Sequence, residues 1–440
     1  MRTVRRERVT LALAVWGVLV SQVLLYPGVA DLVTALGASG DLDAATAFLL
    51  AEFAAFVAFA GLWGALSDAI GRRTPLVVAG ALGGAVAALA LATVAGTGVP
   101  WIGVLALRAL SGAATIGAFS LAVTMLADLS GGSGRNLGAA GVAIGLGAAI
   151  GSVVGGRLSA IDPVAPLYGT AALLVAVALL VLTVRDRAPG RAVPVGEAGT
   201  GAVESTDAGT ADPSRVDEGR RAPTGGGVGL RRVLAGIRSR PELVVPYAFG
   251  LIDRMTAGFF ALVGVFYFRE TFGLDAAGAG LVLAAFFLPF AVLQYPLGNL
   301  SDRVGRVRPV VLGSVAYGVA IVGVGLAPTL PAAVAAMVVV GAAGALVAPA
   351  TMALVVDVAG TDDRGVAIGG FNVFGSVGFL AGFAVGGLAA GELGYLPAFL
   401  LVGGLEVGIA LVAGRAVRRL AVAPDERDSD GDAGGATTGG

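Results

Sequence analysis

Twelve apolar runs of about 20 residues follow one another along the chain and restrict what it can fold into. A helix needs about 20 residues to cross roughly 30 Å of hydrocarbon, so each run predicts one membrane-spanning helix. A membrane β-barrel would instead show stretches of about ten residues with alternating polarity. The sequence therefore predicts an all-α polytopic membrane protein. The runs are 10–33, 44–66, 75–95, 100–126, 138–158, 164–184, 242–268, 277–300, 309–327, 332–356, 366–390 and 395–414.

A long segment without apolar periodicity, residues 185–241, separates the sixth run from the seventh. Its Gly, Pro, Ala, Asp, Glu and Arg residues follow no period, which is typical of a disordered linker. We therefore expect two six-helix bundles, over residues 1–184 and 242–420, and an acidic, disordered cytoplasmic tail over residues 421–440.

The linker ends in the basic stretch "GLRRVLAGIRSR". Leu230, Val233, Leu234 and Ile237 are spaced i, i+3, i+4 and i+7 among arginines, which predicts an amphipathic helix lying on the anionic inner leaflet. A solvated basic linker is the alternative.

The basic residues indicate the orientation of the chain. All 29 are arginine, and 25 of them fall in the termini and in the loops on the N-terminal side of the membrane. Under the positive-inside rule both termini are cytoplasmic, and we expect a multi-pass protein of the plasma membrane. The loops on the opposite side are acidic. Their acidic residues are Asp31, Asp41, Asp43, Asp162, Glu270, Asp275 and Glu392.

Histidine, cysteine and lysine are all missing from the sequence. Without His and Cys the chain lacks the commonest metal ligand, the commonest proton shuttle and any disulfide, so we expect no metal site and no cofactor. It also lacks a Gly-x-x-x-x-Gly-Lys phosphate loop and a Gly-x-Ser-x-Gly element, which disfavours an ATP-driven pump or an enzyme. The missing lysine and the acidic tail favour a halophilic archaeon as the source, although a high-GC bacterium shares part of this bias.

Two charged phrases repeat along the chain, "GALSDAIGRRTP" at residues 64–75 and "GNLSDRVGRVRP" at residues 298–309. Each phrase follows the second span of its half. The glycines of the fifth and eleventh spans also repeat with identical spacing. Internal duplication of this kind is typical of a transporter whose halves rock about a central site.

At these residues the chain resembles the major facilitator superfamily, and the resemblance covers nearly all of it except the linker and the tail. The repeated phrases are similar to the family's cytoplasmic loop motif. Arg108 and Gly112 in "RALSG" resemble its fourth-span Arg-x-x-x-Gly element. The resemblance implies two six-helix bundles related by a pseudo-two-fold axis and secondary transport by alternating access.

The resemblance also implies a cytoplasmic gate whose contacts hold the inner side closed. Acidic side chains just beyond the hydrocarbon can accept hydrogen bonds from a helix N-terminus or from an arginine across the gap between the halves. Topology signals and solvated turn residues are the alternative. The expected gate residues are Gly64, Asp68, Gly71, Arg72, Arg73, Asp128, Arg135, Gly298, Asp302, Gly305, Arg306, Asp357 and Arg364.

The fifth-span glycines resemble the Gly-x8-Gly-x3-Gly-Pro-x2-Gly-Gly motif of the family's drug/proton antiporters, which favours that branch. Ser152 and Phe383 stand where the motif has Pro, so the kink that Pro would impose is missing. Ordinary packing of small residues is the alternative. The expected helix-packing glycines are Gly147, Gly151, Gly155, Gly378, Gly382 and Gly386.

Five ionisable residues fall well inside the predicted spans, away from their ends: Glu52, Arg108, Asp253, Arg254 and Glu406. Each costs at least about 2.5–3.5 kcal/mol on insertion scales, so each is a functional hypothesis. Asp253 and Arg254 point about 100° apart on a helix and cannot simply neutralise each other. In the family, spans one, four, seven and ten line the cavity, which implies that Asp253 or Arg254 faces Arg108 there. The twelfth span is peripheral in the family, so we expect Glu406 to have a scaffold role.

A carboxylate whose partner changes between two states can load and release a proton. We therefore take Asp253 and Glu52 as proton-coupling candidates, with Arg108 and Arg254 as tuning charges or anchors for an anionic group. Permanent structural ion pairs are the alternative. The other polar residues expected in the cavity are Gln22, Tyr26, Gln294 and Asn372.

This thin polar lining suits a lipophilic solute better than a sugar. The leading hypothesis is a monomeric secondary transporter that exports a hydrophobic or amphipathic small molecule against a proton, or alternatively a sodium, gradient. The first alternative is proton-coupled uptake of a small organic anion, with Arg108 and Arg254 as anchors. A membrane sensor that does not transport is disfavoured by the duplicated gate. No nucleic-acid partner is expected.

Overall fold

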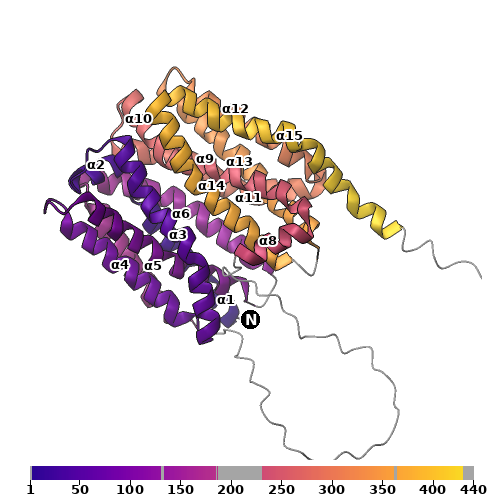
Figure 1. The fold of residues 1–440 in the computed structure, drawn as a ribbon, viewed down its shortest axis with the longest axis horizontal. Helices are drawn as coiled ribbons and strands as arrows, with labels where there is room; N and C mark the ends of the chain where they lie inside the picture. The colour runs from indigo at the N-terminus through magenta and orange to yellow at the C-terminus, as the bar shows by residue number, and fades with distance from the viewer. Residues whose placement is uncertain (1, 130–132, 185, 187–229, 361–363, 430–440) are drawn as a thin grey trace, which may run out of the picture.

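The computed structural model describes residues 2–129, 133–184, 186, 230–360 and 364–429, and every regular element in these ranges is a helix (Figure 1). Ten helical segments there are long and apolar enough to cross a membrane. Helices α1 (Arg2–Val23) and α7 (Ala165–Val181) supply the remaining two spans. The predicted twelve-helix fold is confirmed.

The two halves lie side by side in Figure 1, in indigo to magenta and in red to yellow. The N-terminal half also contains α2 (Val29–Ala35), α3 (Leu42–Ile70), α4 (Thr74–Val94), α5 (Trp101–Ala127) and α6 (Ser133–Ile161). The C-terminal half contains α8 (Leu230–Ser239), α9 (Val244–Phe259), α10 (Val265–Phe272), α11 (Ala276–Val304), α12 (Val307–Gly325), α13 (Leu330–Ala359), α14 (Arg364–Leu393) and α15 (Tyr395–Ser429).

Two spans are less regular than the sequence predicts. The first run, 10–33, is not one helix, because α1 ends at Val23 and α2 begins only at Val29. Pro27 lies in this break, and proline disfavours helix both at its own position and at the preceding residue. The seventh span changes to a π-helix over Phe260–Gly264 between α9 and α10.

The repeated glycines bring the same pairs of helices together in each half. A Cβ on Gly155 of α6 would lie 2.2 Å from the Leu24 carbonyl oxygen at the end of α1, and a Cβ on Gly378 of α14 would lie 2.0 Å from the Leu251 oxygen of α9. Only glycine allows this approach of two backbones. The other glycines of the two seams are Gly147 and Gly151, facing α1, and Gly382 and Gly386, facing α9.

The halves contact each other through α6 with α11 and through α3 with α14. A Cβ on Gly156 of α6 would lie 2.4 Å from the Ala276 oxygen of α11. At the equivalent place in the other half, a Cβ on Gly387 of α14 would lie 2.5 Å from Thr46 Oγ1 of α3. The two contacts between the halves, α6 with α11 and α14 with α3, are therefore related by the same pseudo-two-fold axis that relates the halves.

The linker and the tail are only partly described. Residues 187–229 and 430–440 lie outside the described ranges. Helix α8 occupies the stretch predicted to be amphipathic, but its Val233 is buried against Leu243, Tyr247 and Phe371, while Leu234 is exposed. Part of the apolar face therefore packs on the C-terminal half and not on lipid. Helix α15 continues to Ser429, so it extends into the segment 421–440 that we expected to be disordered.

We expect Gly378→Ala to destabilise the protein. Overpacking costs about 1–3 kcal/mol and exceeds the roughly 1 kcal/mol that Ala contributes over Gly inside a helix. Thermal unfolding in detergent measures the difference, with Gly408→Ala on α15 as the matched control, because no heavy atom lies within 4 Å of a Cβ there. Equal melting temperatures for the two variants would contradict the packing role of Gly378.

Candidate functional site

The bundle has two ends, which carry different contacts. Figure 1 shows the start of α1 and helix α8 at one end and α2 and α10 at the other. We call the first end the termini face and the second the distal face. The repeated loop motifs lie at the termini face, at the ends of α3 and α11.

At the termini face each loop turns at a glycine in the left-handed region, Gly71 with φ +66° and Gly305 with φ +81°. Residues that carry a Cβ rarely adopt this backbone conformation, so the motif glycines permit the sharp turn. The motif arginines then pair within their own half. Arg73 forms an ion pair with Asp128 of α5.

In the C-terminal half Arg306 pairs with Asp302 and also donates from Nε to Asp357 Oδ2 of α13 at 3.2 Å. These ion pairs do not join the halves, contrary to the expectation of contacts across the gap. The remaining gate residues take simpler positions. Gly64 is buried, and Gly298 approaches Pro349. The side chains of Asp68, Arg72 and Arg364 are exposed. The side chain of Arg135 lies outside the described part of the chain.

One residue of the termini face was missed by sequence reasoning. Asp186, just after the sixth span, accepts hydrogen bonds from the backbone N–H groups of Arg73 at 2.9 Å and Thr74 at 3.0 Å. These groups begin α4, where a negative charge is favourable. Asp186 therefore holds the loop motif against the end of its own half.

The distal face carries an ion pair between the halves. Arg269 of α10 donates to Asp31 Oδ1 of α2 at 2.9 Å. We call this pair the distal latch. The sequence placed both residues in loops on the same side of the membrane but gave no signal that they meet, because 238 positions separate them.

Aromatic rings close the same side from within. Phe53 of α3 stacks on Phe379 of α14 with centroids 4.8 Å apart and meets Phe383 edge-on at 5.2 Å. Tyr26, in the break after α1, contacts Phe383 at 6.3 Å. The two halves are therefore in contact on the distal side, and this side of the bundle is closed.

Glu52 and Arg108 form a buried ion pair inside the N-terminal half, between α3 and α5. Their side chains are only 1% and 2% exposed. The Arg108 guanidinium also lies 4.7 Å from the centroid of the Phe48 ring. Gly112 makes the pairing possible, because a Cβ there would lie 2.2 Å from the Glu52 carbonyl oxygen.

Asp253 of α9 is 5% exposed, and its Oδ1 has no hydrogen-bond partner among the described residues. Arg254 is half-buried beside Gly375 of α14. The ion pair of Arg108 is with Glu52 and not with either of these two residues, which we had expected to face it. Sequence reasoning also gave Glu406 a scaffold role, whereas the structure places it next to Asp253.

The other expected cavity residues do not gather at one place. Gln22 is buried, and its Nε2 has no hydrogen-bond partner in the described part of the chain. Gln294 faces Gly141 of α6, and Asn372 is exposed. Tyr26 is 2% exposed and lies within electrostatic range of Glu52 and Arg108. Of the predicted set, the structure thus brings together Tyr26, Glu52 and Arg108.

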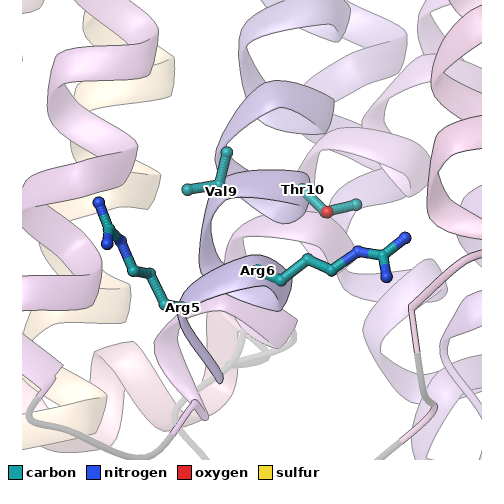
Figure 2. Close-up of a pocket in the computed structure, with 4 residues that line it drawn as sticks. All are labelled: Arg5, Arg6, Val9 and Thr10. Atoms are coloured by element: carbon teal, nitrogen blue, oxygen red, sulfur yellow. The ribbon is translucent and has the colours of Figure 1, made fainter. Parts of the chain in front are cut away.

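A separate pocket of about 310 Å³ opens at the termini face. It is lined by Arg5, Arg6, Val9 and Thr10 of α1, and Figure 2 shows the two arginines extending in opposite directions from the helix. Because the arginines diverge, they present two separate positive charges and cannot both bind the same small anion. The pocket contains none of the charges that are buried between the helices.

Two similar six-helix halves, a repeated loop motif at one face and charges buried between the helices define a polytopic secondary transporter. The sequence profile of the Major Facilitator Superfamily matches residues 11–268 and 247–437, and the chain belongs to this family. It is a membrane protein that carries small molecules and not an enzyme.

Among curated proteins, the chain is 29% identical over 385 residues to magnetosome protein MamH of Paramagnetospirillum magneticum, covering 84% of this chain and 81% of that protein. It is 32% identical over 114 residues to the uncharacterized MFS-type transporter Rv1250 of Mycobacterium tuberculosis, covering 26% and 20% of the two chains.

Solved transporter structures share the fold. The human organic anion transporter MFSD10 (TETRAN) is 18% identical with a TM-score of 0.63, over 93% of this chain and 99% of that one. A bacterial homologue of the human lysosomal transporter Spinster, in an inward-facing and unoccupied conformation, is 14% identical with a TM-score of 0.70, over 96% and 98%.

We expect Glu52→Gln to destabilise the protein by about 3–5 kcal/mol, because it leaves Arg108 buried without its counter-charge. The double variant Glu52→Leu with Arg108→Met removes both charges and should unfold close to the wild-type temperature, since apolar replacement of a buried ion pair is often neutral. Thermal unfolding of both variants is the measurement. A double variant no more stable than Glu52→Gln would show that the residues do not act as a pair.

We expect Arg269→Gln to open the distal face more often. A partly exposed ion pair contributes about 0.2–1 kcal/mol, which changes the ratio of open to closed molecules about 1.5- to 5-fold. The chain has no native cysteine, so spin labels on Thr97→Cys and Thr329→Cys, exposed in distal loops of opposite halves, can report the distance distribution. The exchanged pair Asp31→Arg with Arg269→Asp should restore the wild-type distribution, and identical distributions in all variants would exclude the latch.

Proposed function

We propose that the chain is a proton-coupled exporter of a hydrophobic or amphipathic small molecule, with both termini in the cytoplasm and the bundle in the plasma membrane. The observation that carries this proposal is Asp253, a carboxyl group buried in the middle of α9 with an unpaired oxygen. An ionised carboxylate is costly in such a place, so a change of its surroundings during transport is tied to the gain or loss of a proton.

Glu52 fits the coupling role less well than Asp253. Its carboxylate is paired with Arg108, and Gly112 locks the two helices together at the same level. The adjacent guanidinium favours the ionised form of this carboxylate, whereas Asp253 has no such ion pair among the described residues. We therefore assign proton coupling to Asp253 and a structural role to Glu52 and Arg108.

The proposed substrate class rests on the side chains between the halves. Phe53 from one half meets Phe379 and Phe383 from the other, with no polar contact among them. When the halves separate, these rings become the wall of the opened space. Aromatic walls with few polar groups bind lipophilic compounds better than sugars.

Uptake of a small organic anion is the second candidate. Arg108 cannot serve as its anchor, because it is 2% exposed and bound to Glu52. Arg254 is half-buried and has no ion pair within the described ranges, so it alone could hold a carboxylate. The human structure MFSD10, similar in fold, is an organic anion transporter.

Flux into inverted membrane vesicles under an imposed pH gradient tests the proposal, with lipophilic cations and small carboxylates as the compounds offered. We expect lipophilic cations to accumulate and Asp253→Asn to abolish the accumulation that depends on the gradient. Glu392→Gln, exposed in the last turn of α14 at the distal face, is the matched carboxyl control and should transport like the wild type.

Two other outcomes decide against the proposal. Accumulation of carboxylates alone, abolished by Arg254→Ala, would establish the anion carrier instead. Accumulation that follows a sodium gradient and does not respond to the pH gradient would show that sodium, and not a proton, is the coupling ion.

A further inference from the structure

A second carboxyl group is buried beside Asp253. Glu406 of α15 is 1% exposed and interacts electrostatically with Asp253 of α9. Thr256, one turn after Asp253, donates from Oγ1 to Glu406 Oε1 at 3.4 Å. Helices α9 and α15 therefore bring two acidic side chains together inside the C-terminal half.

Each of these acids has an oxygen without a partner. Asp253 Oδ1 and Glu406 Oε2 are buried and accept no hydrogen bond from the described residues. Tyr317 of α12 interacts electrostatically with both acids and lies within hydrogen-bonding reach of Thr256. Three helices thus meet at one polar cluster in an otherwise apolar bundle.

The nearest cation, Arg254, interacts electrostatically with Asp253 but forms no ion pair with either acid among the described residues. Arg254 follows Asp253 in the chain, so its side chain points about 100° away on the helix. Its Cγ would lie 3.2 Å from a Cβ on Gly375, which places it against α14. Two ionised carboxylates in an apolar environment repel each other and lack hydration, and one proton between them relieves both costs.

We propose that Asp253 and Glu406 form a proton-binding site in the C-terminal half, in which the two carboxyl groups share one proton. The inference rests on the proposed function, because it names where the coupling proton binds. Binding adds one proton and changes the pair from two negative charges to one. Release reverses this step, and no other bond forms or breaks. Thr256 and Tyr317 position the acids and do not bind the proton themselves.

The packing around the pair favours a proton over a metal cation. A Cβ on Gly318 of α12 would lie 3.0 Å from the Cβ of Glu406 and 2.4 Å from the Gly403 oxygen. The helices are therefore already in close contact at Glu406. A sodium ion needs a shell of several oxygens, whereas a proton adds no volume.

The two acids lie on helices whose closest packing contacts are with different helices. Helix α9 is bound to α14 through Gly378 and Gly382, and α14 carries the rings that reach the N-terminal half. Glu406 instead lies on α15, packed against α12 at Gly318. Helix α14 also touches α15, but its contact with α9 is far more extensive, so we expect a movement of α14 to act mainly on α9 and to change how the pair holds its proton. The π-helix Phe260–Gly264 interrupts the regular ladder of the same span close to Thr256.

Infrared difference spectra of the full chain in lipid nanodiscs, recorded between acid and alkaline pH, test the shared site. We expect a carbonyl band of a buried protonated carboxyl group. Asp253→Asn and Glu406→Gln should each change its frequency, and the double variant should remove it. Thr256→Val keeps both acids and should shift the band by removing a donor. Glu392→Gln is the exposed carboxyl control and should leave the band unchanged.

A band that responds to only one of the two acids, or that survives the double variant, overturns the shared site. Loss of the band when sodium replaces potassium at constant pH overturns the choice of a proton as ligand. Transport under a pH gradient, measured on the same variants, separates the two proposals. If transport follows the pH gradient but neither substitution changes the band, the proton site is refuted and the proposed function stands. If both substitutions change the band but transport does not follow the pH gradient, the proposed function is refuted and the proton site stands.

Discussion

The contact of backbone with backbone at glycine is the constraint on which the rest of this structure depends. Helices in lipid gain nothing from hiding apolar side chains from each other, since lipid is equally apolar, so they associate by close approach. Gly155 and Gly378 provide that approach at equivalent places, each against a carbonyl oxygen of the neighbouring helix. Each half becomes a rigid unit, and the charges between its helices take positions that these seams determine.

The halves share this packing but differ in their buried charges. In the N-terminal half the carboxylate of Glu52 has Arg108 as a counter-charge, supported by the Phe48 ring. In the C-terminal half Asp253 and Glu406 have each other. An ion pair of opposite charges is satisfied at any ordinary pH, whereas a pair of like charges is satisfied only with a proton. Under the proposed proton site, the duplicated fold therefore carries one half suited to structure and one suited to ion binding.

The sequence predicts features that depend on the spacing of residues along one helix. It does not predict features that depend on how two helices are placed relative to each other. Run length gave the twelve spans, and the recurrence of Gly147, Gly151 and Gly155 gave a packing face, because both follow from helical geometry. The meeting of Glu406 with Asp253 depends on the rotation and depth of two helices 150 positions apart, as the Thr256 contact shows. The peripheral place of the twelfth span in the family gave no signal that Glu406 lies beside Asp253, since a peripheral helix can still turn one side chain inward.

The position where the antiporter motif has proline bears on how the halves are held in the closed arrangement. Gly280 of α11 approaches the carbonyl of Ser152, and Phe383 at the equivalent place packs against Phe53 across the interface. Proline would kink both helices and disturb these contacts, whereas here α6 and α14 each run as a single helix. Aromatic pairs contribute about 0.5–1.5 kcal/mol each, and a partly exposed ion pair contributes less. Close glycine contacts, such as that of Gly156 with Ala276, also join the halves, so the closed arrangement rests on backbone packing between α6 and α11 as well as on the rings and the distal latch.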